Sequence, residues 1–164
     1  MKALRFRAMA LLLACAVCTP LGAESLDDIR KIAASAPERA MGRLDVYLKA
    51  NPGDAQAWFL KGLVLADQNK REEAIGVFTA LTQDYPELPE PYNNLGVLYA
   101  ANGEIDKARL AFERALLANP EYAAARENIA DVYLRMAADA YAKAVDRPSA
   151  KAKLERVKAI LDTK

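Results

Sequence analysis

Side chains that could act as nucleophiles or general bases are scarce in this chain of 164 residues. It has no histidine, the residue that most often takes up a proton in catalysis near neutral pH. Its two cysteines, Cys15 and Cys18, lie close to the amino terminus. No glycine-rich phosphate loop or Gly-Lys-Ser/Thr motif occurs. These features argue against hydrolytic, phosphoryl-transfer and thiol chemistry.

The remaining polar groups also fit structural roles better than catalytic ones. Acidic pairs occur at 27–28 and 72–73, but adjacent residues do not share a helix face, so each pair is expected in a solvated first turn. Three serines stand at predicted helix starts or turns without a base beside them, namely Ser25, Ser35 and Ser149. We therefore expect no catalytic residue, no metal site and no cofactor.

Composition points to a helical globular domain. Hydrophobic residues make up 53% of the chain and charged residues 27%. Alanine and leucine are frequent, and there are only seven glycines and eight prolines, which favours helices. The formal net charge is +1, and no basic or acidic block occurs. The sequence thus gives no sign of a basic surface that would bind nucleic acid.

The first 23 residues have the layout of a secretory signal peptide. Lys2, Arg5 and Arg7 precede ten apolar residues in a row, 8–17, and a short exit that ends at Ala23. Ten apolar residues are too few to span a bilayer, which needs about 20. We expect cleavage after Ala23 and a periplasmic protein.

Two alternatives to simple export remain open. The stretch "LLAC" resembles a bacterial lipobox, in which case Cys15 would be lipidated and would anchor the protein to a membrane. The apolar run could also be retained as an anchor. After cleavage at Ala23, no cysteine would remain, so packing alone would hold the fold.

The chain repeats itself at an interval of 34 residues. Glycine falls on glycine and proline on proline in this register, so chance coincidence of apolar residues is a poor explanation. The seven aligned pairs are Trp58 with Tyr92, Gly62 with Gly96, Leu65 with Tyr99, Ala74 with Ala108, Phe78 with Phe112, Leu81 with Ala115, and Pro86 with Pro120.

Each repeat unit is predicted to contain two helices. In the unit that is clearest, the first helix spans 89–101 and the second spans 104–118. Gly103 can take the left-handed conformation that ends the first helix, and Asn119-Pro120 ends the second. Gly96 and Ala108 are small, which lets the two helices approach so that aromatic side chains interlock around them.

The sequence resembles the tetratricopeptide repeat family. Residues 89–122 match the family pattern at Tyr92, Leu95, Gly96, Tyr99, Ala108, Phe112, Ala115 and Pro120. Residues 55–88 match it at Trp58, Gly62, Ala74, Phe78 and Pro86. They depart from it at Lys61, where leucine is usual, and at Leu65, where tyrosine is usual. Leu60 is expected to take over the packing of the missing leucine.

The resemblance implies an all-α fold, a right-handed superhelical solenoid of antiparallel helix pairs. Outside the two well-formed units, 55–122, the register weakens on both sides. Residues 24–54 form a degenerate first pair, whose first helix starts with a capping box at Ser25 and Asp28. Residues 123–164 form a degenerate last unit, with one long helix over 121–145 and a capping helix over 149–161.

In this family the first helix of each pair lines a concave groove, which implies a partner-binding surface. The register places a mixed apolar and polar set there: Gln56, Phe59, Leu63, Asp67, Glu90, Asn93, Val97, Glu127, Asp131 and Arg135. Asn93 is expected to hold a peptide backbone, because its amide both donates and accepts. The acidic residues of this set disfavour a clamp for a terminal carboxylate.

Two functions follow from the resemblance. The first is a scaffold or adaptor of the cell envelope that binds a protein or peptide segment in the groove. The second is a structural subunit, lipid-anchored through Cys15, of an outer-membrane, pilus or secretion assembly. The partner in both is a protein, not a nucleic acid, and a membrane is involved only if Cys15 is lipidated.

Overall fold

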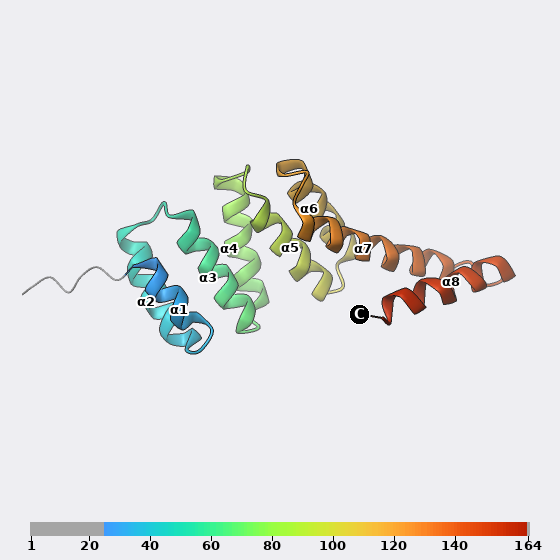
Figure 1. Cartoon of the computed structure of the whole chain (residues 1–164), viewed down its shortest axis with the longest axis horizontal. Helices are drawn as coiled ribbons and strands as arrows, with labels where there is room; N and C mark the ends of the chain where they lie inside the picture. Colours follow the sequence, from blue (N-terminus) through green and yellow to red (C-terminus); the bar gives the residue numbers. More distant parts are fainter. Residues whose placement is uncertain (1–24, 164) are drawn as a thin grey trace, which may run out of the picture.

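The computed structural model describes residues 25–163, and all their regular structure is helical (Figure 1). The predictions of a signal peptide over 1–23 and of lipidation at Cys15 lie outside the described residues. The described residues form eight helices: α1 Leu26–Ala33, α2 Pro37–Ala50, α3 Ala55–Asp67, α4 Arg71–Asp84, α5 Pro89–Ala101, α6 Ile105–Ala118, α7 Ala123–Ala142 and α8 Pro148–Leu161. None of these is long and apolar enough to cross a membrane.

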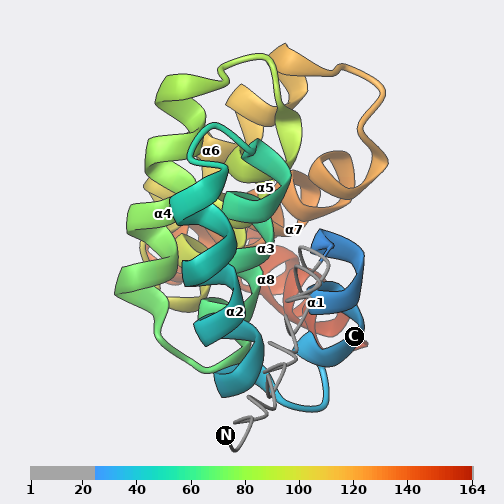
Figure 2. The same ribbon diagram turned by 90° about the vertical axis from the view of Figure 1, so that its left-hand side faces the viewer.

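The helices stack as pairs along one axis, which confirms the predicted solenoid. Each first helix packs on the second helix of its own pair, and each second helix packs on the first helix of the next pair. The molecule is therefore elongated, with α1 and α2 at one end and α8 at the other (Figure 1). Seen end-on, α2 and α4 lie on one side and α1 and α7 on the other (Figure 2).

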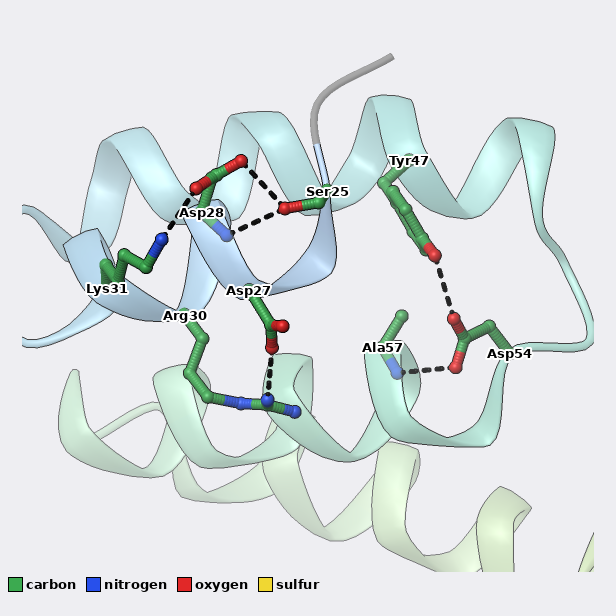
Figure 3. Close-up of polar contacts among 8 residues, drawn as sticks. All are labelled: Ser25, Asp27, Asp28, Arg30, Lys31, Tyr47, Asp54 and Ala57. Carbon is green, nitrogen blue, oxygen red and sulfur yellow. Dashed lines mark hydrogen bonds and ion pairs between the residues drawn. The ribbon is translucent and has the colours of Figure 1, made fainter. Parts of the chain in front are cut away.

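Local capping explains where the helices start and turn. The Ser25 hydroxyl accepts from the Asp28 backbone amide at 3.2 Å and donates to the Asp28 carboxylate at 2.7 Å (Figure 3), so the predicted cap is present. Gly103 has φ +78°, as predicted for the end of α5. Asn69 occupies the same place after α3 with φ +59°, because asparagine tolerates the left-handed region better than most residues.

Close contact between paired helices centres on two glycines. A Cβ atom at Gly62 would lie 2.6 Å from Cε1 of Phe78, and one at Gly96 would lie 2.6 Å from Cδ1 of Phe112. Both phenylalanines are fully or almost fully buried. Ala74, Ala108 and Ala115 are buried without any exposed surface, so the small residues of the pattern sit where the helices meet.

The aromatic residue that opens each unit ties it to the preceding one. Trp58 Nε1 donates to the carbonyl of Pro52 at 2.8 Å, and the Tyr92 hydroxyl donates to the carbonyl of Thr82 at 3.2 Å. In both cases the acceptor lies near the end of the preceding second helix. The bonds link neighbouring units through backbone groups that helix ends leave without partners.

Neighbouring residues compensate for the two departures from the family pattern, at Lys61 and Leu65. Leu60 is only 6% exposed, which confirms that it packs in place of the missing leucine, and Leu65 is buried without the tyrosine hydroxyl. Lys61 is half-buried instead. Its Nζ lies 2.7 Å from the Asp45 carboxylate and 5.3 Å from the centre of the Trp58 ring.

The carboxy-terminal end forms as one long helix and a returning helix, with shorter bounds than predicted for the long one. A turn in which the Tyr122 amide bonds the Asn119 carbonyl delays the start of α7 to Ala123. A second turn follows Ala142, so α7 ends three residues before the predicted Val145. Helix α8 begins at Pro148, one residue before the predicted start, and its apolar stripe is buried or half-buried, at Ala150, Leu154, Val157 and Leu161.

Candidate functional site

The ten predicted groove residues all lie on α3, α5 and α7, the first helices of three successive pairs. We call the surface formed by α1, α3, α5 and α7 the first-helix face. Five of the ten are exposed: Gln56, Asp67, Val97, Glu127 and Arg135. Four are half-buried: Phe59, Leu63, Glu90 and Asp131. Asn93 is buried.

One pocket on this face surrounds Phe59. It has a volume of about 460 Å³ and is lined by Arg30, Ala55, Gln56, Phe59, Leu88, Glu90 and Pro91. The Phe59 ring is held in place by the buried ring of Phe78, with centroids 5.6 Å apart at an angle of 56°. This Phe59 pocket brings together three of the predicted residues, from two successive units. It can accept an apolar side chain between polar groups.

Arg30 is the charged residue of this pocket that sequence reasoning missed, along with Ala55, Leu88 and Pro91 of its apolar lining. It comes from α1, in the weakly matching first unit, so the repeat register gave no reason to single it out. Its guanidinium donates to the Asp27 carboxylate at 2.8 Å, and Figure 3 shows this pair reaching from α1 toward the helices below it. Arg30 and Glu90 thus place opposite charges around one apolar pocket.

A second pocket lies between α5 and α7. Its volume is about 280 Å³, and its lining is apolar at the base, with three polar side chains. It contains the predicted residues Val97, Asp131 and Arg135, together with Ala100, Ala101, Phe112, Asn128 and Val132. We call it the Asn128 pocket. An amide, a carboxylate and a guanidinium around an apolar base can orient a peptide segment through hydrogen bonds.

Asn93 makes a contact inside the protein that sequence reasoning did not anticipate. Its Oδ1 accepts from Asn128 Nδ2 at 2.9 Å, which joins α5 to α7. Asn93 is 8% exposed, and Asn128 lines the pocket in its place. The repeat register could have found Asn128, since it lies 34 residues after Asn94. The Asn94 amide, however, bonds the Glu90 carbonyl within its own helix at 2.9 Å.

Besides Asn93, three predicted residues belong to neither pocket. Leu63 packs against the hydrophobic cluster around Phe78, which accounts for its partial burial. Asp67 and Glu127 are exposed on the same face and line neither of these two pockets. The structure therefore separates the predicted groove into two pockets and a set of carboxylates around them.

Glu90 also shapes the electrostatics where α7 begins. Burial raises the pKa of the Tyr122 hydroxyl, and the negative charge of Glu90 raises it further. Tyr122 occupies the place in its unit that Leu88 occupies in the preceding one. Glu90 consequently faces the Phe59 pocket and the neighbourhood of Tyr122.

The opposite side of the solenoid has a pocket of its own. It is about 340 Å³ in volume, and Trp58, Val77 and Tyr85 contribute the large side chains of its lining. None of the predicted groove residues lines it. Among residues 25–163, no group of acidic, histidine or cysteine side chains is arranged to hold a metal ion.

Comparison with known proteins supports the repeat register. Residues 30–89 and 89–122 match models of the tetratricopeptide repeat. Among curated proteins, the human protein O-mannosyl-transferase TMTC1 is 28% identical over 97 residues. That alignment covers 57% of this chain and 11% of the human protein, so this chain corresponds to a small part of that enzyme.

Several solved structures share the fold. YrrB, described as a tetratricopeptide repeat protein with an unusual peptide-binding site, is 26% identical with a TM-score of 0.57, over 61% of this chain and 52% of YrrB. MamA from Desulfovibrio magneticus RS-1 is 21% identical with a TM-score of 0.59, over 84% and 74% of the two chains. The first repeat domain of RPAP3, bound to an HSP90 peptide, is 14% identical with a TM-score of 0.62, over 68% and 89%.

Proposed function

Because this chain belongs to the tetratricopeptide repeat family, we propose that the protein is a non-catalytic scaffold. It binds a protein or a peptide segment on its first-helix face. The observation that carries the proposal is the Phe59 pocket, where a fixed aromatic ring lies among Arg30, Gln56 and Glu90. Pockets with an apolar base and a few oriented polar groups are typical of binding sites.

Two further observations support the first-helix face as the binding surface. Val97 leaves 46% of its surface exposed beside the Asn128 pocket, where an apolar contact would cover it. The solved structure of YrrB, which shares this fold, is described as having a peptide-binding site. Solenoids of this kind commonly use their extended inner surface for binding.

The proposal includes export to the periplasm, with residues 1–23 removed. Its support is the basic start, apolar run and small-residue exit in the sequence. Helix α1 begins at Leu26 with Ser25 as its cap, so a cut after Ala23 leaves the first helix and its cap intact. Intact-mass analysis of the protein from a bacterial periplasmic extract should give a chain that starts at Glu24.

The mass also separates the alternative functions. A chain that starts at a diacylglyceryl-modified Cys15 would favour the lipid-anchored structural subunit over a soluble scaffold. An unprocessed chain that stays in the cytoplasm would contradict export. Neither result depends on what the first-helix face binds.

Site-specific photo-crosslinking tests the binding surface. A photo-reactive residue at Gln56 probes the Phe59 pocket, and one at Gln83, which is exposed on α4, is the matched control. We expect the photo-reactive residue at Gln56 to crosslink to one protein, at a single peptide of that protein. The residue at Gln83 should not crosslink to it. Phe59→Leu, which keeps an apolar side chain against Phe78, and Val97→Ser should both weaken that capture. Equal capture from Gln83, or capture that neither substitution reduces, would move the binding surface elsewhere.

A further inference from the structure

Charge is unevenly distributed along the folded chain. Residues 25–142 contain 13 basic and 18 acidic side chains, a net charge of −5, whereas residues 143–163 contain six basic and three acidic ones, a net charge of +3. The balanced total therefore hides a basic carboxy-terminal segment. We call its six basic side chains the basic end: Lys143, Arg147, Lys151, Lys153, Arg156 and Lys158.

The structure gathers the basic end at one extremity of the molecule. All six side chains are exposed. Helix α8 and the turn before it lie at the end of the solenoid opposite α1 (Figure 1). Within residues 25–163, no carboxylate lies within ion-pair distance of Arg147, Lys151 or Arg156, so their charge is not neutralised locally. Lys143 and Lys158, by contrast, pair with Asp139 and Glu155.

The same region exposes aliphatic side chains beside the charges. Val145 is 52% exposed and Ile160 is 51% exposed. Ala150 and Leu154 face α7, whereas Ala152, Glu155 and Ala159 are exposed on the outer side of α8, where the Glu155 carboxylate pairs with Lys158 Nζ at 3.3 Å. The two alanines are small, so the long basic side chains on the flanks of α8 can extend past them toward a flat surface.

We propose that the basic end binds the surface of an anionic lipid bilayer. Clusters of four to eight Lys and Arg on an amphipathic helix are typical of such binding, and each contributes through attraction to negatively charged headgroups. The apolar stripe of α8 stays packed on α7, so the contact is electrostatic and peripheral, with Val145 and Ile160 at the headgroup level. The Phe59 pocket lies between α1, α3 and α5, and it remains open in this arrangement.

A membrane suits this surface better than nucleic acid does. No aromatic residue occurs in 143–163, and the neighbouring Tyr141 is half-buried, with Lys153 Nζ 5.6 Å from the centre of its ring, so the region offers no exposed row of rings on which bases could stack. Four of the six basic residues are lysines, and two exposed aliphatic side chains accompany them. Aliphatic groups beside lysines favour the interface of a bilayer. The inference does not depend on which partner the first-helix face binds.

Vesicle sedimentation with the full chain tests the proposal. The probes are vesicles of phosphatidylglycerol mixed with phosphatidylcholine, and of phosphatidylcholine alone, at low and at high salt. The wild type should bind the anionic vesicles more tightly, and this excess should fall steeply as salt screens the charges. Replacing Arg147, Lys151 and Arg156 together by glutamine should reduce the salt-sensitive binding roughly 100-fold, from about fivefold for each charge.

The matched control replaces Lys49, Lys70 and Arg71 by glutamine, which changes the net charge equally at exposed positions away from α8. This control variant should keep most of the salt-sensitive binding to anionic vesicles. Circular dichroism melting of both variants checks that each is folded. Equal losses in the two variants, or none in either, would overturn the proposal. Tighter binding to a DNA duplex than to the anionic vesicles would also overturn it.

Discussion

Gly96 lies against the ring of Phe112 so closely that a single methyl group at Gly96 would overlap that ring. The same relationship joins Gly62 to Phe78 one unit earlier, where the methyl group would lie 2.6 Å from Cε1. Since both rings are enclosed by the core, neither can swing away without disturbing its neighbours. In each unit the glycine of the first helix therefore makes room for the buried phenylalanine of the second helix.

Substitution of Gly96 should destabilise the protein through this contact. Gly96→Ala and the bulkier Gly96→Leu are expected to cost about 1–3 kcal/mol in the free energy of unfolding, because they overpack a filled core. Chemical denaturation monitored by circular dichroism measures this cost. An unchanged midpoint for Gly96→Leu would refute the packing described for α5 and α6.

Gly76 provides the matched control for this substitution. It lies in the middle of α4, is exposed, and has no neighbouring atom within 4 Å of the position that a Cβ would take. Gly76→Ala should stabilise the protein by about 0.5–1 kcal/mol, because alanine loses less conformational freedom in a helix. Opposite signs for the two glycine substitutions would separate close packing from helix propensity.

The bond between Asn93 and Asn128 predicts a stability effect on the binding face. Asn93→Ala leaves the Asn128 amide without its partner at 2.9 Å, which should cost about 1–2 kcal/mol. Asn94→Ala, which loses only a bond within its own helix, should cost less. Denaturation of Asn93→Ala, of Asn128→Ala and of the variant that combines them gives the coupling energy between the two residues. A coupling near zero would mean that this bond contributes nothing to stability.

The raised pKa of Tyr122 predicts that the protein loses stability at alkaline pH. The folded protein holds the hydroxyl proton more tightly than the unfolded chain does, so this contribution to stability is present below about pH 10 and is lost as the pH rises further. Glu90→Gln should lower the pKa of Tyr122 only part of the way, because burial is the larger cause. Ultraviolet titration, with Tyr122→Phe to identify the signal, measures the shift. A titration that Glu90→Gln leaves unchanged would exclude the influence of Glu90.

The lowered pKa values of two carboxyl groups predict that the protein loses stability in acid. Hydrogen bonding to Lys31 lowers the pKa of Asp28, and hydrogen bonding to Lys107 lowers that of Glu104. Their contribution is present above the ordinary carboxyl range, near pH 4, and is lost as the pH falls below it. Asp28→Asn combined with Glu104→Gln should lower the melting temperature at neutral pH and leave it unchanged in strong acid. A constant difference at every pH would assign the effect to packing or capping.

The helices and their pairing can be predicted from the sequence. The 34-residue register shows which residues of successive units are equivalent, and the small size of Gly96 and Ala108 indicates where the two helices of one unit meet. Helix ends follow from local signals such as Ser25, Gly103 and Pro148, because capping depends on neighbouring residues. The least accurate bounds were those of α7, where the turn at Asn119 and the one after Ala142 shortened a continuous helical pattern.

The sites that side chains from different units share depend on the tertiary structure. Arg30 enters the Phe59 pocket from a unit that the pattern barely matches, and Asn93 bonds Asn128 across two helices. Such contacts depend on the distance and rotation between stacked pairs, which a linear register does not contain. The basic end is contiguous in the sequence, but only the packing of α8 back on α7 decides that its side chains are exposed at the end of the solenoid opposite α1.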